Sequence, residues 1–160
     1  MTKAKSPIPA GFHALTPCLT VKSAKEAIEF YKKAFNAKEV SCKTGPGGKV
    51  MHAEIKIGDS VLFLNDEMPE MGVYAPEGKG GNPMRLWLYV EDVDRIFNQA
   101  EGAGARALMP VSDMFWGDRF GKLADPFGYE WELATRKEDL DDAEIEKRQK
   151  AFFAAMAGAK

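Results

Sequence analysis

The strongest constraint on the fold is an internal repeat, because the chain carries one pattern of structural elements twice. Each copy begins with a short apolar strand and a helical run, over residues 19–35 in the first copy and 88–102 in the second. Two strand-like segments then meet at a glycine turn, at Gly58 and at Gly128. Corresponding positions lie 69 or 70 residues apart. The repeat predicts two βαβββ modules and therefore an α+β fold.

The expected helices have recognisable ends. Ser23 and Glu26 have the spacing of a capping box at the start of the first helix. Asp92 opens the second helix, which stops at Gly102 or Gly104. In both runs the apolar side chains recur at helical spacing, which predicts one buried stripe for each helix.

The strands separate their side chains into two kinds of face. Strand side chains alternate, and in the strands of both copies one face is mainly apolar while the other is polar or amphipathic. An antiparallel sheet with helices on one side and solvent on the other produces this alternation. If the two modules turn their open faces together, they form a curved mixed sheet with an open cleft. The residues that would line this cleft are Glu54, Arg85, Trp87, Tyr89 and Glu132.

The remaining segments divide the chain. The stretch at 69–83 is rich in proline and glycine, which predicts a linker or a loop over a site. Past Thr135, a charged run with an imperfect apolar side predicts a C-terminal helix, capped near Asp139, that packs on the domain or on a partner subunit. The expected divisions are an N-terminal arm at 1–12, a two-module domain at 13–135 (module one 13–68, loop 69–83, module two 84–135) and a helical extension at 136–160.

Charge and composition argue against several classes of protein. With 22 Lys and Arg against 24 Asp and Glu, the formal net charge of −2 indicates no basic surface for nucleic acid. No run of apolar residues is long enough to span a bilayer, so we expect no membrane partner. The N-terminus lacks the apolar core of a signal peptide, and two cysteines cannot form a disulfide framework. These features predict a cytoplasmic protein.

Three segments resemble the vicinal oxygen chelate superfamily, which includes glyoxalase I, bleomycin-resistance proteins and extradiol dioxygenases. The run AIEFYKKAFNAKEV is similar to the first helix of the family, and HAEIKIGDSVLFLND, residues 52–66, is typical of its small bacterial glyoxalase-like branch. MFWGDRFGKLADPFGYEWELAT, residues 114–135, is similar to the closing segment of that branch, although Tyr129 stands where many relatives have His. The resemblance covers residues 13 to 135 and implies a homodimer, with the cleft formed within one chain or across two.

The resemblance also implies where a metal ion would bind. Metal-using members take two ligands from each module, usually His and Glu, one on the first strand and one on the last. The corresponding positions hold Thr16, Arg85, Glu132 and either Leu62 or Phe63. Only Glu132 matches, and a guanidinium at Arg85 would repel a cation and pair with the carboxylate instead. Since a catalytic metal site usually needs three protein ligands, we expect no metal cofactor; the alternative is one divalent ion.

Other candidate side chains leave alternatives open. His52 and Glu54 share the open face of one strand, where they form an acid–base pair, an irregular metal site with Glu132, or a simple surface hydrogen bond. Trp116 belongs either to the core or to a cavity wall. Arg119 either pairs with the preceding aspartate in a loop or reaches the ligand.

The favoured function is metal-independent binding of a small organic molecule, with sequestration of the bleomycin-resistance type. The expected ligand contacts are Arg85, Trp87, Tyr89, Glu54, Glu132, His52, Trp116 and Arg119. The alternative is an enzyme: a glyoxalase-like lyase or isomerase, or a dioxygenase relative, with an irregular metal site, or a metal-free catalyst that uses Glu132 or His52. A third reading makes Arg85 and Glu132 a buried ion pair in a sheet that binds no ligand.

Overall fold

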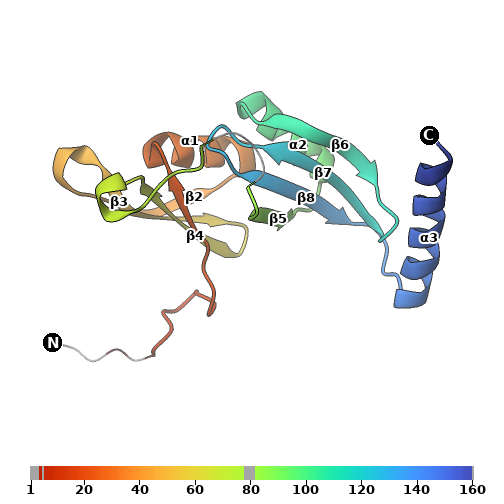
Figure 1. Cartoon of the computed structure of the whole chain (residues 1–160). Coiled ribbons are helices and arrows are strands. Elements are labelled where there is room, and N and C mark those ends of the chain that lie inside the picture. Colours follow the sequence, from red (N-terminus) through yellow and green to blue (C-terminus); the bar gives the residue numbers. More distant parts are fainter. Residues whose placement is uncertain (1–3, 5, 78–81, 160) are drawn as a thin grey trace. The chain divides into compact units, whose positions relative to one another are not determined.

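Figure 1 shows the computed structural model of the chain, which describes residue 4 and residues 6–77 and 82–159. The chain forms two compact units, residues 1–80 and 81–160, which we call unit 1 and unit 2. Their boundary falls in the loop predicted at 69–83. Part of that loop (78–81), part of the predicted N-terminal arm (1–3 and 5) and residue 160 of the predicted extension lie outside the described residues.

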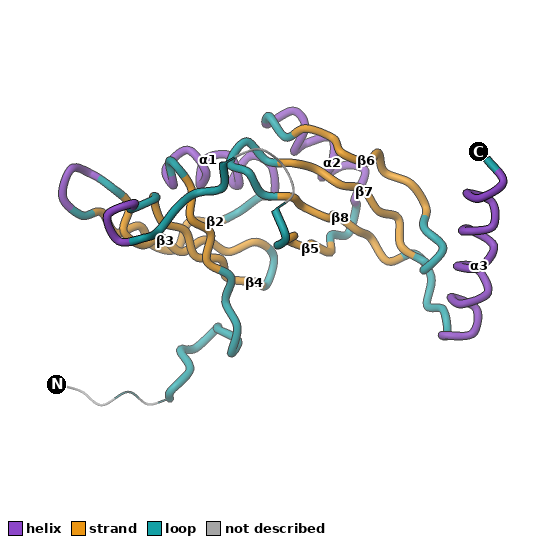
Figure 2. The backbone as a smooth tube through the Cα atoms, viewed as in Figure 1, coloured by secondary structure: helices purple, strands orange, loops and turns teal. Residues whose placement is uncertain are grey.

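Unit 1 contains a four-stranded mixed sheet and one long helix. The strand order is β1-β4-β3-β2, in which β1 and β4 are parallel and the other neighbours antiparallel. The helix α1 contacts all four strands and lies along the sheet in Figure 2. The elements are β1 (Cys18–Val21), α1 (Ala24–Phe35), β2 (Lys38–Thr44), the 3-10 turn η1 (Pro46–Gly48), β3 (Val50–Ile57), β4 (Ser60–Asp66) and the 3-10 turn η2 (Pro69–Met71).

Unit 2 repeats this architecture. Its strand order is β5-β8-β7-β6, again with a parallel pair, β5 and β8, and antiparallel pairing elsewhere. Both units therefore have the order βαβββ, which confirms the predicted α+β fold, while the cleft that the modules would share stays a prediction. The elements are β5 (Arg85–Tyr89), α2 (Val93–Ala103), β6 (Arg106–Asp113), β7 (Asp118–Ala124), β8 (Glu130–Arg136) and α3 (Asp142–Gly158).

The ends of α1 and α2 confirm the sequence signals. The side chain of Ser23 accepts a hydrogen bond from the backbone N–H of Glu26 at 3.4 Å, and that of Asp92 accepts one from the N–H of Arg95 at 3.0 Å. These caps satisfy N–H groups that the first turn of a helix leaves without intrahelical partners. The second helix ends before Gly104, the later of its two predicted stops, whose φ of 118° suits glycine.

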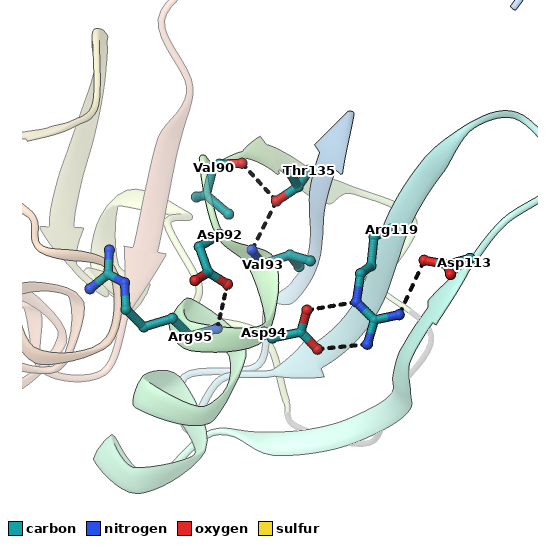
Figure 3. A network of polar contacts seen from close by, with 8 residues as sticks. All are labelled: Val90, Asp92, Val93, Asp94, Arg95, Asp113, Arg119 and Thr135. Carbon is teal, nitrogen blue, oxygen red and sulfur yellow. Dashed lines mark hydrogen bonds and ion pairs between the residues drawn. The ribbon is translucent and has the colours of Figure 1, made fainter. Parts of the chain in front are cut away.

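The repeat extends to a second hydrogen bond that fixes each helix to the last strand of its module. Asp66 Oδ1 accepts from the N–H of Ala24 at 2.6 Å, and Thr135 Oγ1 accepts from the N–H of Val93 at 2.8 Å. Figure 3 shows that the Thr135 hydroxyl also donates to the carbonyl of Val90, at 2.8 Å. Asp66 and Thr135, which lie 69 residues apart, thus make the equivalent hydrogen bond in the two copies, although their side chains differ.

A glycine in β7 allows α2 to pack closely on its sheet. A Cβ atom at Gly121 would lie 2.7 Å from Cε2 of Phe97 in α2 and 3.0 Å from Cγ2 of Val111. Position 121 therefore faces the helix. Because strand side chains alternate, the even-numbered residues of β7 face the other side of the sheet.

The predicted C-terminal helix is confirmed as α3, but it begins later than expected. Its N-cap is Asp141, whereas Asp139 forms an ion pair with Arg136 at 2.7 Å instead of capping the helix. None of the residues of α3 is buried. Among the described residues, no helix is both long enough and apolar enough to cross a membrane.

We expect Gly121→Ala to lower the free energy of unfolding of unit 2 by about 1–3 kcal/mol, because the new methyl group must displace the ring of Phe97. The control is Gly102→Ala in α2, where a Cβ atom meets nothing within 4 Å and should stabilise the helix by about 0.5–1 kcal/mol. Urea denaturation followed by tryptophan fluorescence measures both, since all three tryptophans belong to unit 2. Equal effects of the two substitutions would contradict the close packing.

Candidate functional site

A candidate site lies on the face of the unit 2 sheet opposite α2, which we call the open face. Gly121 points toward α2, so its alternating neighbours in β7 point away from it. The first strand and the last strand supply the rest of the surface through their parallel pairing, in which Trp87 lies opposite Glu132. The residues that form the open face are Arg85, Trp87, Tyr89, Trp116, Asp118, Phe120, Lys122 and Glu132.

The charged part of the open face is a carboxylate held between two cations. Glu132 lies on β8, the strand between β5 and β7, and is 8% exposed. Arg85 Nε approaches its Oε1 at 3.3 Å from one side, and Lys122 Nζ approaches the same oxygen at 3.2 Å from the other. A carboxylate with so little access to water needs such partners. The predicted contact of Arg85 with Glu132 is present. The arginine side chain is 54% exposed, however, so the two residues do not form the buried ion pair that the hypothesis of a sheet without a ligand requires.

Next to these charges stands a group of aromatic rings centred on Trp87. Its ring centroid lies 5.0 Å from that of Phe120, 6.0 Å from Tyr89 and 6.4 Å from Trp116. These separations are those of favourable aromatic pairs. Trp87 is nevertheless 44% exposed, so its neighbours orient the ring without covering it.

A buried carboxylate orients two of these rings. Asp118 is 3% exposed, and its Oδ2 accepts hydrogen bonds from the hydroxyl of Tyr89 at 2.9 Å and from Nε1 of Trp116 at 3.1 Å. Partial burial, together with the hydrogen bond to the negative Asp118, raises the pKa of Tyr89. Trp116 is thus half-buried beside the open face, with its polar edge satisfied.

Arg119 lies on the side of the unit 2 sheet that faces α2, and not on the open face. Its Nε and Nη2 contact the two carboxylate oxygens of Asp94 in α2, at 2.6 and 2.7 Å, and its Nη1 contacts Asp113 at 3.1 Å, as drawn in Figure 3. The guanidinium holds the pKa of Asp94 below its usual range. Arg119 therefore pairs with α2 and β6 and not with the preceding Asp118, whereas a contact of Arg119 with a ligand stays a prediction.

A pocket of about 410 Å³ lies near Arg119, and its charged groups are largely paired with one another. Within it, Arg148 of α3 forms an ion pair with Glu138, and Arg119 one with Asp113. The lining residues are Asp113, Met114, Gly117, Asp118, Arg119, Lys137, Glu138 and Arg148.

The candidates His52 and Glu54 belong to unit 1. His52 Nε2 lies 3.2 Å from Glu54 Oε1, so the predicted pair is in hydrogen-bonding contact. The imidazole also packs edge-on against Phe63, with ring centroids 4.7 Å apart. An acid–base role for the pair stays a prediction.

The residues at the expected metal positions do not fit a metal site. In the strand pairing, Cys18 lies opposite Phe63 as Trp87 lies opposite Glu132, so the counterpart of Glu132 is Phe63 and not Leu62. A phenyl ring offers no ligand atom, and both Arg85 and Lys122 already contact Glu132. Among the residues described in either unit, no three His, Cys, Asp or Glu side chains converge as a metal site requires.

Sequence reasoning missed Lys122, Phe120 and the role of Asp118. All three lie on β7, whose faces were not assigned from the sequence. Antiparallel pairing across the turn before Gly128 places Lys122 opposite Glu132 and Phe120 opposite Ala134. Counting outward from that turn is the sequence signal that identifies them.

The sequence matches the model of a known protein family. The family model described as "Glyoxalase/Bleomycin resistance protein/Dioxygenase superfamily" matches residues 12–133. An uncharacterised protein of Mycobacterium bovis is 41% identical over 136 residues, which cover 83% of this chain and 90% of that protein.

Two solved structures illustrate the structural likeness. A protein of Pseudomonas aeruginosa, PA1353, superposes with a TM-score of 0.62 at 26% identity, over 78% of this chain and 98% of that one. The fosfomycin resistance protein FosX from Mesorhizobium loti superposes with a TM-score of 0.59 at 14% identity, over 80% and 93% of the two chains. The second likeness shows the fold alone.

We expect Tyr89 to ionise at a higher pH than an ordinary tyrosine, because burial and Asp118 favour the protonated phenol. The chain has four tyrosines, so the ultraviolet difference titration of the parent against Tyr89→Phe isolates this one. In Asp118→Asn, which keeps an acceptor oxygen but removes the charge, the pKa of Tyr89 should move down toward its ordinary value. An unchanged titration in that variant would contradict the contact.

Proposed function

We propose that this chain, which belongs to the Glyoxalase/Bleomycin resistance protein/Dioxygenase superfamily, binds a small organic molecule on the open face of unit 2 without a metal ion. The observation that carries the proposal is the exposure of Trp87 at the centre of an otherwise ordered aromatic group. Proteins that bind small molecules combine apolar and aromatic surface with a few well-placed polar groups, and the open face has both.

The arrangement of the open face favours binding over a purely structural role. Rings that merely fill a core are covered, whereas Trp87 is held in place by Phe120 and Trp116 and still faces outward. Because the hydrogen bonds to Asp118 already order Tyr89 and Trp116, little side-chain entropy is lost when a ligand contacts them.

The contacts of Glu132 with two cations argue against a metal ion at this residue. A divalent ion at this carboxylate would have to displace Arg85 and Lys122. The corresponding residue of unit 1, Phe63, has no ligand atom to offer. Arg85 and Lys122 both contact Oε1 of Glu132, so this oxygen is already engaged and is not free to accept a proton from a substrate. Metal-independent binding is therefore preferred to the lyase, isomerase and dioxygenase alternatives.

We expect Trp87→Ala to weaken binding of the neutral aromatic probe N-phenylnaphthylamine by about tenfold, because the loss of an aromatic contact costs on the order of 1.5 kcal/mol. Probe fluorescence on titration measures the Kd. The matched control is Tyr74→Ala, since Tyr74 is an exposed aromatic residue of unit 1, outside the site. If the two variants bind the probe equally, the open face is not its binding site.

We expect removal of metal ions to leave the Kd of the same probe unchanged within about twofold. The protein is treated with EDTA, desalted and titrated beside an untreated sample, and the metal content of the untreated sample is measured. Stoichiometric zinc, nickel, manganese or iron that disappears in Glu132→Gln would overturn metal-independent binding and favour the enzyme alternative.

A further inference from the structure

The guanidinium of Arg85 offers unused donors beside the exposed ring. It contacts Glu132 through Nε, and among the described residues Glu132 is its only ion-pair partner. The terminal nitrogens Nη1 and Nη2 thus remain available, on a side chain that is 54% exposed. A guanidinium donates hydrogen bonds and accepts none, and two parallel donors match the oxygens of a carboxylate, sulfonate or phosphonate.

Glu132 positions these donors. The carboxylate of Glu132 is almost inaccessible to water, and its Oε1 contacts Nε of Arg85. Lys122 brings a second positive charge to the same oxygen. The two cations together exceed the charge of the one carboxylate that they contact, while the second carboxylate of the open face, Asp118, accepts hydrogen bonds from Tyr89 and Trp116. The acidic Glu130 lies opposite Arg85 in the β5–β8 pairing but forms no ion pair with it in the described part of the chain.

The spacing of the strand connects these donors to the aromatic surface. Arg85 and Trp87 are two residues apart on one face of β5, which corresponds to roughly 6.6 Å along a strand. One small molecule can therefore place a ring against Trp87 and an attached anionic group against Arg85.

We propose that the open face of unit 2 selects aromatic compounds that carry an anionic group, with the ring on Trp87 and the anion on Arg85. This inference rests on the proposed function and adds a ligand class to it. The carboxylate of Glu132 acts as a positioning residue, because it orients Arg85 and does not contact the ligand.

Two probes that differ by one sulfonate test the inference. Anilinonaphthalene sulfonate carries the anion, and N-phenylnaphthylamine is the same framework without it. For both probes, the site signal is the part of the fluorescence titration that is lost in Trp87→Ala. We expect the sulfonate to bind the parent more tightly than the neutral probe, and Arg85→Gln to weaken the sulfonate about tenfold while it changes the neutral probe by less than about twofold.

Binding of the neutral probe also shows that Arg85→Gln still folds. The charge control is Arg95→Gln, which removes an exposed arginine on α2, on the other side of the sheet, and should leave both probes unchanged. If Arg85→Gln leaves the sulfonate unchanged, or weakens both probes equally, the anion assignment is wrong while the proposed function stands. If neither probe shows a Trp87-dependent signal, the proposed function and the anion assignment both fail.

Discussion

The parallel pairing of β5 with β8 is the constraint on which the site depends. It joins the first strand of the module to its last, so that residues more than forty positions apart in sequence, such as Trp87 and Glu132, stand side by side. The same pairing places Thr135 where it can bind the start of α2. The helix is thereby fixed on one face of the sheet, and the opposite face is the open face. A slip of β5 by one residue would turn Arg85, Trp87 and Tyr89 toward the helix side of the sheet.

The charges of the open face set the kind of ligand that it can bind. Glu132, on the last strand of the module, has an arginine and a lysine from the two flanking strands as its partners. The same carboxylate that could bind a cation instead orients a guanidinium toward solvent. In our proposal, the site therefore prefers an anionic ligand, and the same fold that could support a cation site supports this preference.

The fold could be predicted from the sequence because the repeat, the caps and the strand alternation all indicate the same modules. Arg85, Trp87 and Glu132 followed from that alternation, since parity alone assigns them to one face. Lys122 and Asp118 were missed because their assignment needs the register of β7, which has to be counted from the turn that joins it to β8. The ion-pair partner of Arg119 was not found, because Asp94 lies on a helix that only the tertiary structure brings to the strand.

In our proposal, an aromatic ligand lies on Trp87 with its anion at Arg85, and no metal ion is bound at Glu132. A crystal structure of the protein with anilinonaphthalene sulfonate tests this arrangement most directly. We predict the naphthalene ring against the indole of Trp87 and sulfonate oxygens within hydrogen-bonding distance of the Nη atoms of Arg85. A metal ion bound to Glu132, or the probe bound away from this face, would contradict it.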